Sequence, residues 1–198
     1  MGFASALLET PLLLDTCILT DWRLSKPAIR RQIDGYIYAH EGIAPALAST
    51  TVFEVLHGFE KEFLKPGRPS EQDYAGLRRT KDLIEQSSVV LPFDERAAGI
   101  AAYVFPRLTN SERSKNWSDV LIAATALAHG YGVATADRKD FELIGRKIVR
   151  RSPLALPCNM ESELNWFSAA DTQIGTLTSC CNALSSYATL AVVAHPRI

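Results

Sequence analysis

The stretch PLLLD (residues 11–15) decides how this chain folds. Residues 11–14 form a short, unbroken apolar run, which is typical of a strand buried on both faces of a parallel sheet. Asp15 closes the run, so the sequence places its carboxylate at the carboxyl end of that strand. A charge at the edge of a buried segment is costly unless it is solvated, paired or bound to a metal. Asp15 is therefore the first candidate for a functional residue.

Three more apolar segments of strand length follow, and helical segments separate them. The predicted strands are residues 42–49 (GIAPALAS), 88–94 (SVVLPFD) and 131–137 (YGVATAD). The predicted helices cover residues 16–23, 27–40, 51–64, 70–86, 95–108 and 118–129. This alternation predicts an α/β fold in which helices flank both faces of a parallel β-sheet.

Helix signals place two further acids at the start of helices. We expect Thr50 or Thr51 to cap one helix, with Glu54 in its first turn. Residues 109–117 are expected to form a loop, and Ser118 is expected to cap the next helix directly before Asp119.

Four carboxylates, those of Asp15, Glu54, Asp119 and Asp137, therefore stand at the boundaries of strands and helices. In parallel α/β sheets, ligands bind in the crevice beyond the carboxyl ends of the strands. Each acid alone has an ordinary explanation as a cap, a first-turn residue or a turn former, but four of them around one crevice predict a single acidic site. Carboxylate oxygens are the ligands that Mg²⁺ and Mn²⁺ prefer, so a divalent-metal site is expected there.

Composition narrows the class of protein. The 198 residues suffice for one domain with a substantial core, and a net charge of −1 gives the whole chain no attraction to polyanions. A nucleic-acid partner would need a local basic patch; Arg138 and Lys139 either begin such a patch or belong to a solvated face.

The four cysteines form no Cys-x-x-Cys pair, so we expect reduced thiols in a cytoplasmic protein. Residues 174–194 are uncharged but rich in polar side chains, and we expect no membrane span.

Four motifs resemble, in this order, those of PIN-domain nucleases, and in particular the VapC-type toxins of bacterial toxin–antitoxin pairs. They are LLLDTCIL with Asp15 and Thr16, TVFEVLHGFEK with Glu54 and Gly58, SDVLIAATALAHG with Asp119, and TADRKDF with Thr135, Asp137 and Phe141. The resemblance covers residues 11–151. Two features depart from the family pattern: SERSKNW (residues 111–117) lacks the usual short glycine-containing approach, and residues 152–198 have no counterpart.

The resemblance implies a PIN-like, Rossmann-like three-layer nuclease domain in residues 1–151. It leaves residues 152–198 as an extension that is either helical or poorly ordered. It implies an endoribonuclease that depends on Mg²⁺ or Mn²⁺ and hydrolyses structured RNA, such as transfer or ribosomal RNA, in the cytoplasm. It also implies a cognate antitoxin that blocks the site, and a homodimer.

The chemistry of metal-assisted phosphodiester hydrolysis suggests roles for these residues. Asp15, Asp119 and Asp137 are expected to contact the metal directly or through water, and Glu54 is expected to help orient the attacking water. The residues expected to bind the substrate or hold a ligand carboxylate are two hydroxyls and two cations: Thr16, Thr135, Arg138 and Lys139.

Two other functions stay open on the sequence. A phosphotransfer enzyme of a doubly wound fold would use Asp15 as its nucleophile, but Cys17 stands where such a site needs a second aspartate. A non-catalytic PIN-like module that binds RNA or a partner protein would not need all four acids, and this chain keeps them.

Overall fold

The computed structural model describes residues 11–148, 165–168, 175–176 and 192–194. Strands in these residues form one sheet in the order β3-β2-β1-β4-β7-β5-β6, in which the β5–β6 pair is antiparallel and the other pairs are parallel. The strands are β1 (Leu12–Leu14), β2 (Ala46–Ala48), β3 (Val90–Leu91), β4 (Gly132–Thr135), β5 (Asn165–Ser168), β6 (Gly175–Thr176) and β7 (Val192–Ala194). The predicted α/β fold with a parallel sheet is confirmed.

Strand β1 lies between β2 and β4, as its unbroken apolar run predicts. Leu13 is level with Ala46 on β2 and with Val133 on β4. Because the three strands are parallel and in register, their carboxyl ends reach the same edge of the sheet. The Asp15 backbone N–H donates to the Ala134 carbonyl (3.0 Å), which extends the β1–β4 pairing to the start of the acidic site.

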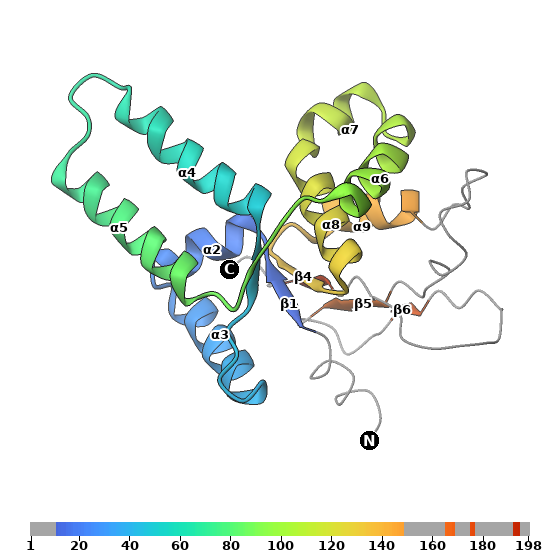
Figure 1. Cartoon of the computed structure of the whole chain (residues 1–198), viewed down its shortest axis with the longest axis horizontal. Coiled ribbons are helices and arrows are strands. Elements are labelled where there is room, and N and C mark those ends of the chain that lie inside the picture. Colours follow the sequence, from blue (N-terminus) through green and yellow to red (C-terminus); the bar gives the residue numbers. More distant parts are fainter. Residues whose placement is uncertain (1–10, 149–164, 169–174, 177–191, 195–198) are drawn as a thin grey trace.

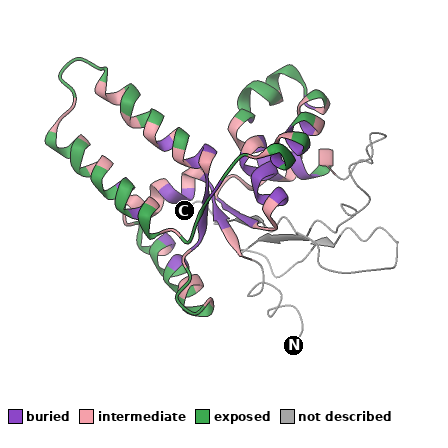
Figure 2. Cartoon of the chain, viewed as in Figure 1, coloured by how far each residue is buried: buried purple, intermediate pink, exposed green. Residues whose placement is uncertain are grey.

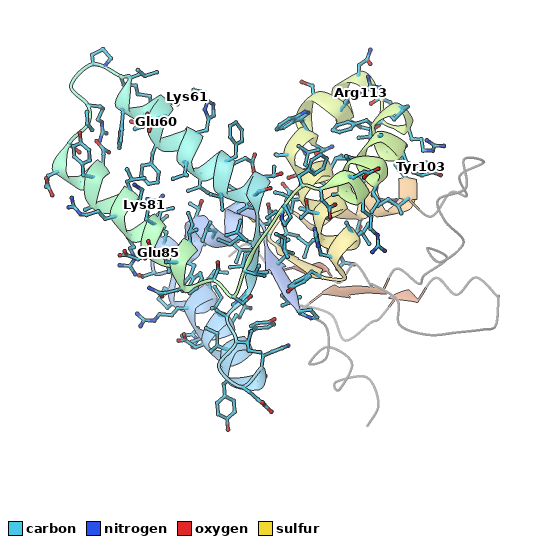
Figure 3. The ribbon with its side chains drawn as sticks, viewed as in Figure 1. Glu60, Lys61, Lys81, Glu85, Tyr103 and Arg113 are labelled. Carbon is cyan, nitrogen blue, oxygen red and sulfur yellow. The ribbon has the colours of Figure 1, made fainter. Side chains whose placement is uncertain are left out.

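Helices cover both faces of the sheet, and the two groups lie on opposite sides of β1 in Figure 1. The first group is α2 (Thr16–Arg23), α3 (Pro27–Ala39), α4 (Ser49–Phe63) and α5 (Glu71–Gln86). The second group is α6 (Glu95–Val104), the 3-10 turn η1 (Phe105–Arg107), α7 (Asn110–Lys115), α8 (Trp117–His129) and α9 (Arg138–Ile148). The charged residues labelled on α4 and α5 in Figure 3 are exposed, so the outer part of this helix pair lies in solvent.

Alternate strand residues build two cores. Leu13 packs with α6, α8 and α9, whereas its neighbour Leu14 packs with α2, α3, α4 and α5. Both leucines are at most 2% exposed, and burying such a side chain contributes about 1.5–3 kcal/mol. Buried residues accordingly concentrate in the strands and on the helix faces turned toward them (Figure 2). This packing holds β1 rigidly and fixes the position of Asp15.

The predicted start of α4 is wrong. The helix begins at Ser49, whose hydroxyl accepts the Phe93 N–H (3.1 Å), and the Thr51 hydroxyl inside the helix donates to a backbone carbonyl of β1 (3.3 Å). Neither Thr50 nor Thr51 caps the helix, and Glu54 lies in the second turn instead of the first. The hydroxyls tie α4 to β1 and to the segment that follows β3, which sequence spacing does not reveal.

The predicted loop at residues 109–117 is also wrong. Thr109 and Glu112 form a reciprocal capping box, which starts α7. Asn116 ends α7 and directly precedes α8, so Ser118 lies in the first turn of α8 and is not its cap. Gly130 ends α8 as predicted, in the left-handed conformation (φ 79°) that glycine adopts without strain.

The C-terminal extension is described only in part. Strands β5, β6 and β7 belong to residues 152–198 and join the sheet beyond β4. The expected domain boundary at residue 151 lies outside the described residues and stays a prediction. No helix in the described ranges has the length and apolar character needed to cross a bilayer, and most of residues 174–194 fall outside those ranges.

Candidate active site

The Asp15 carboxylate is buried and held by hydrogen bonds on both oxygens. Oδ1 accepts the Thr16 backbone N–H (2.7 Å), while Oδ2 accepts the Thr135 hydroxyl (2.7 Å) and the Cys17 thiol (3.0 Å). Burial raises the pKa of Asp15, these three donors lower it, and the charge of Glu54 raises it again. The side chain also caps α2, so one residue ends a strand, starts a helix and faces the site.

Glu54 is joined to this centre through a hydroxyl. Thr16 Oγ1 donates to Glu54 Oε2 (2.5 Å), which connects the first residue of α2 with the second turn of α4. Thr16 therefore hydrogen-bonds a carboxylate of the site, which is one of the two roles expected for it.

The pKa of Asp119 shows that the acids act on one another. Its pKa is raised from 3.8 to about 7, mostly by burial and then by the charges of Asp15, Asp140, Glu54 and Asp137, in that order. The side chain lies in the first turn of α8. These interactions show that acids from α2, α4, α8 and the β4–α9 segment share one electrostatic environment, as like charges do when they repel across a short distance.

Asp137 follows β4 and is positioned by the same hydroxyl that bonds Asp15. Its backbone N–H donates to Thr135 Oγ1 (2.9 Å), and Thr135 Oγ1 donates to Asp15 Oδ2. Thr135 is fully buried, so the hydroxyl couples the ends of β1 and β4.

Cys17 is a site residue that the sequence treats only as an ordinary thiol. Its Sγ donates to Asp15 and accepts the Ala136 backbone N–H (3.3 Å). Burial raises the pKa of this thiol to about 12, and the charge of Asp15 contributes. Cys17 is therefore a neutral hydrogen-bond donor and not a nucleophile at physiological pH.

A second residue absent from the predicted site is Lys115. Its Nζ lies 2.9 Å and 2.8 Å from the two carboxylate oxygens of Asp140, a buried residue in the first turn of α9. The capping motif Thr109-x-x-Glu112 is a readable sign of the helix that carries Lys115, but nothing in the sequence indicates that this lysine meets Asp140.

The two cations predicted from the sequence are less closely connected to the acids. Arg138 forms an ion pair with Glu142 one turn along α9, and Lys139 is exposed. Their contact with RNA stays a prediction, as do the catalytic and metal-binding roles of the four acids.

A divalent metal fits the donor chemistry of these residues. The acids offer carboxylate oxygens, and a cation would relieve the repulsion that raises the pKa of Asp119. In the described residues, no group of three or more His, Cys, Asp and Glu side chains is arranged to hold an ion directly. Mg²⁺ keeps several waters and needs only one or two carboxylates, so water can supply the remaining ligands.

A model of the PIN domain family matches residues 12–147, the range that includes all four acids of the predicted site. The chain belongs to the PIN domain family. Over 60 residues, this PIN domain is 42% identical to the VapC ribonuclease Y4jK of Sinorhizobium fredii (strain NBRC 101917 / NGR234). That match covers 30% of the chain and 43% of the relative, so it spans less than half of the relative's length.

Two solved structures resemble this PIN domain. The structure of FitAB bound to an IR36 DNA fragment has a TM-score of 0.51 at 24% identity, covering 68% of this chain and 90% of that chain. FitAcB from Neisseria gonorrhoeae aligns at 26% identity with a TM-score of 0.49, covering 68% of this chain and 93% of that chain. The predicted family and fold are confirmed.

Proposed function

We propose that the chain is a divalent-metal-dependent endoribonuclease, the toxin of a toxin–antitoxin pair. One observation carries this proposal: in a PIN domain, the charges of acids from separate elements act on Asp119, whose pKa burial and these charges raise to about 7. The 42% sequence identity to a VapC ribonuclease over 60 residues supports the reaction class.

The residues divide the work as follows. Asp15, Asp119 and Asp137 would hold Mg²⁺ or Mn²⁺, which when bound neutralises phosphate charge and makes water a better nucleophile. Thr135 and Cys17 keep the Asp15 carboxylate in one orientation. Glu54, whose direction is set by Thr16, would accept a hydrogen bond from the attacking water and align it with the phosphorus.

The proposed partners follow from the resemblance to VapC-type toxins. A cognate antitoxin would cover the acidic site, and the active form would be a homodimer acting in the cytoplasm on structured RNA. The alternative that the sequence leaves open is a non-catalytic module that binds RNA or a protein. Binding without cleavage in the test below would favour it.

The test is cleavage by the purified full chain of labelled transfer and ribosomal RNA with Mg²⁺, with Mn²⁺ and with EDTA. Asp15→Asn should abolish cleavage while still unfolding cooperatively in urea, because the amide removes the charge but keeps the shape. Asp34→Asn, at an exposed acid on α3, is the matched control and should cleave normally. Cleavage that survives exhaustive chelation, or that Asp15→Asn leaves intact, would overturn the proposal.

The toxin assignment has a separate test. Induction of the chain alone should arrest growth, and induction of the Asp15→Asn variant should not. Harmless induction of a chain that cleaves RNA in vitro would refute the toxin role and leave the nuclease assignment standing.

A further inference from the structure

Lys115 occupies a defined place beside the acids because α7 is fixed at both ends. The capping box of Thr109 and Glu112 starts the helix, and buried Asn116 follows Lys115 directly before α8. Arg113, labelled in Figure 3, donates to the backbone carbonyls of Phe105 (3.2 Å) and Leu108 (3.3 Å) and fastens α7 to the turn before it. Lys115 is thus the last residue of a helix that is held at both ends, and it lies four residues before Asp119 in the sequence.

The Lys115 ammonium is held by Asp140, while the rest of its surroundings are open to solvent. It contacts both oxygens of Asp140, at 2.9 Å and 2.8 Å. The side chain of Asp140 is 11% exposed, whereas that of Lys115 is 67% exposed. A cation held in this way keeps its third N–H donor free toward solvent, where a substrate oxygen could accept a hydrogen bond from it.

The charges around Lys115 are those of the candidate site. Its hydrogen bond to Asp140 raises the pKa of Lys115, and the charges of Asp140, Asp137 and Asp119 raise it further. The ammonium therefore stays protonated and lies in the field of three carboxylates of the site. Arg138, in contrast, pairs with Glu142 on its own helix.

We propose that Lys115 is a substrate-contacting residue: held by Asp140 at the edge of the acidic site, its ammonium donates a hydrogen bond to a non-bridging oxygen of the scissile phosphate. The inference rests on the proposed ribonuclease function and names a residue that the family motifs in this sequence do not include. The competing explanation is that Lys115 only neutralises the buried charge of Asp140.

A single substitution first separates loss of the Lys115 ammonium from damage to the whole site. If Lys115 binds phosphate, Lys115→Met should lower kcat/KM for RNA by about 10- to 100-fold at saturating Mg²⁺, as expected for a lost hydrogen bond between charged groups. The same variant should bind Mn²⁺ roughly threefold more tightly or better in calorimetry without RNA, because a positive charge has left the neighbourhood of the cation. Mere misfolding of the site would weaken both.

A double variant separates substrate contact from charge balance. Lys115→Met combined with Asp140→Asn leaves no buried acid unpaired, so stability should approach that of the wild type. Cleavage should remain impaired if Lys115 acts on the phosphate, and should return if it only balances Asp140. Lys115→Arg keeps the charge and the pair with Asp140, and should recover part of the lost kcat/KM.

Lys26→Met is the matched control, because Lys26 is likewise an exposed lysine paired with an aspartate (2.7 Å from Asp21) but does not contact the acidic site. It should change neither cleavage nor Mn²⁺ affinity. Wild-type kcat/KM in Lys115→Met, or restored cleavage in the double variant, would overturn the inference while leaving the nuclease assignment intact. If Lys115→Met does not fold, the double variant alone decides. A wild-type chain that cuts no RNA would instead reject the proposed function.

Discussion

Replacing Asp119 with Asn is predicted to stabilise the metal-free protein, and increasingly so as the pH rises. In the folded chain, burial raises the pKa of Asp119 from 3.8 to about 7, with contributions from the neighbouring acids. Between these two values the folded state keeps a proton that the unfolded state has released. The free energy of unfolding therefore falls as the pH rises through this window, and the asparagine variant escapes that loss.

The magnitude follows from the shift. One pKa unit corresponds to about 1.4 kcal/mol, so the rise from 3.8 to about 7 amounts to roughly 4 kcal/mol once the pH exceeds both values. About 1 kcal/mol of this is already lost at about pH 4.5. The stability difference between Asp119→Asn and the wild type should therefore grow by about 3 kcal/mol between about pH 4.5 and about pH 8.

Urea unfolding in EDTA at both pH values measures this difference. Asp34→Asn serves as the control, since Asp34 is 65% exposed and only 3.9 Å from Arg30 in a surface pair; its effect should stay within about 0.5 kcal/mol at either pH. A difference for Asp119→Asn that does not change with pH, or a variant less stable than the wild type at about pH 8, would refute the reasoning.

Two further predictions concern the hydrogen bonds on Asp15. Thr135→Val removes a fully buried hydroxyl that serves both Asp15 and the Asp137 N–H; urea unfolding should show a loss of about 1–3 kcal/mol, and an unchanged midpoint would count against the network. Cys17 should resist alkylation in the folded protein at about pH 8, because burial raises the pKa of its thiol to about 12. Peptide mapping by mass spectrometry, with the urea-unfolded chain as the control, checks this, and rapid labelling of folded Cys17 would disprove it.

The sequence predicts the framework of this fold because apolar runs and helical periodicity are local signals. The run ending at Asp15 is β1, and α2 covers the predicted residues 16–23. Both cores follow from the alternation of Leu13 and Leu14 on a strand buried on both faces. Convergence of the acids follows in turn, because parallel strands bring their carboxyl ends to one edge.

Helix starts and supporting contacts could not be predicted in the same way. At the start of α4, the Ser49 hydroxyl accepts a hydrogen bond from Phe93, which is distant in the sequence. The contacts of Cys17 with Ala136 and of Lys115 with Asp140 likewise join residues that only the folded chain brings together. Helix and strand propensities depend on neighbouring residues, so they cannot predict such distant pairs.

Calorimetric titration of the metal-free protein with Mn²⁺ tests most directly the central claim that acids from separate elements act together on one hard cation. The wild type is predicted to bind Mn²⁺ and, near neutral pH, to release protons on binding, because Asp119 is then only partly ionised. Asp15→Asn and Asp119→Asn should each weaken binding by at least about tenfold. Folded variants that bind Mn²⁺ as tightly as the wild type would contradict the account.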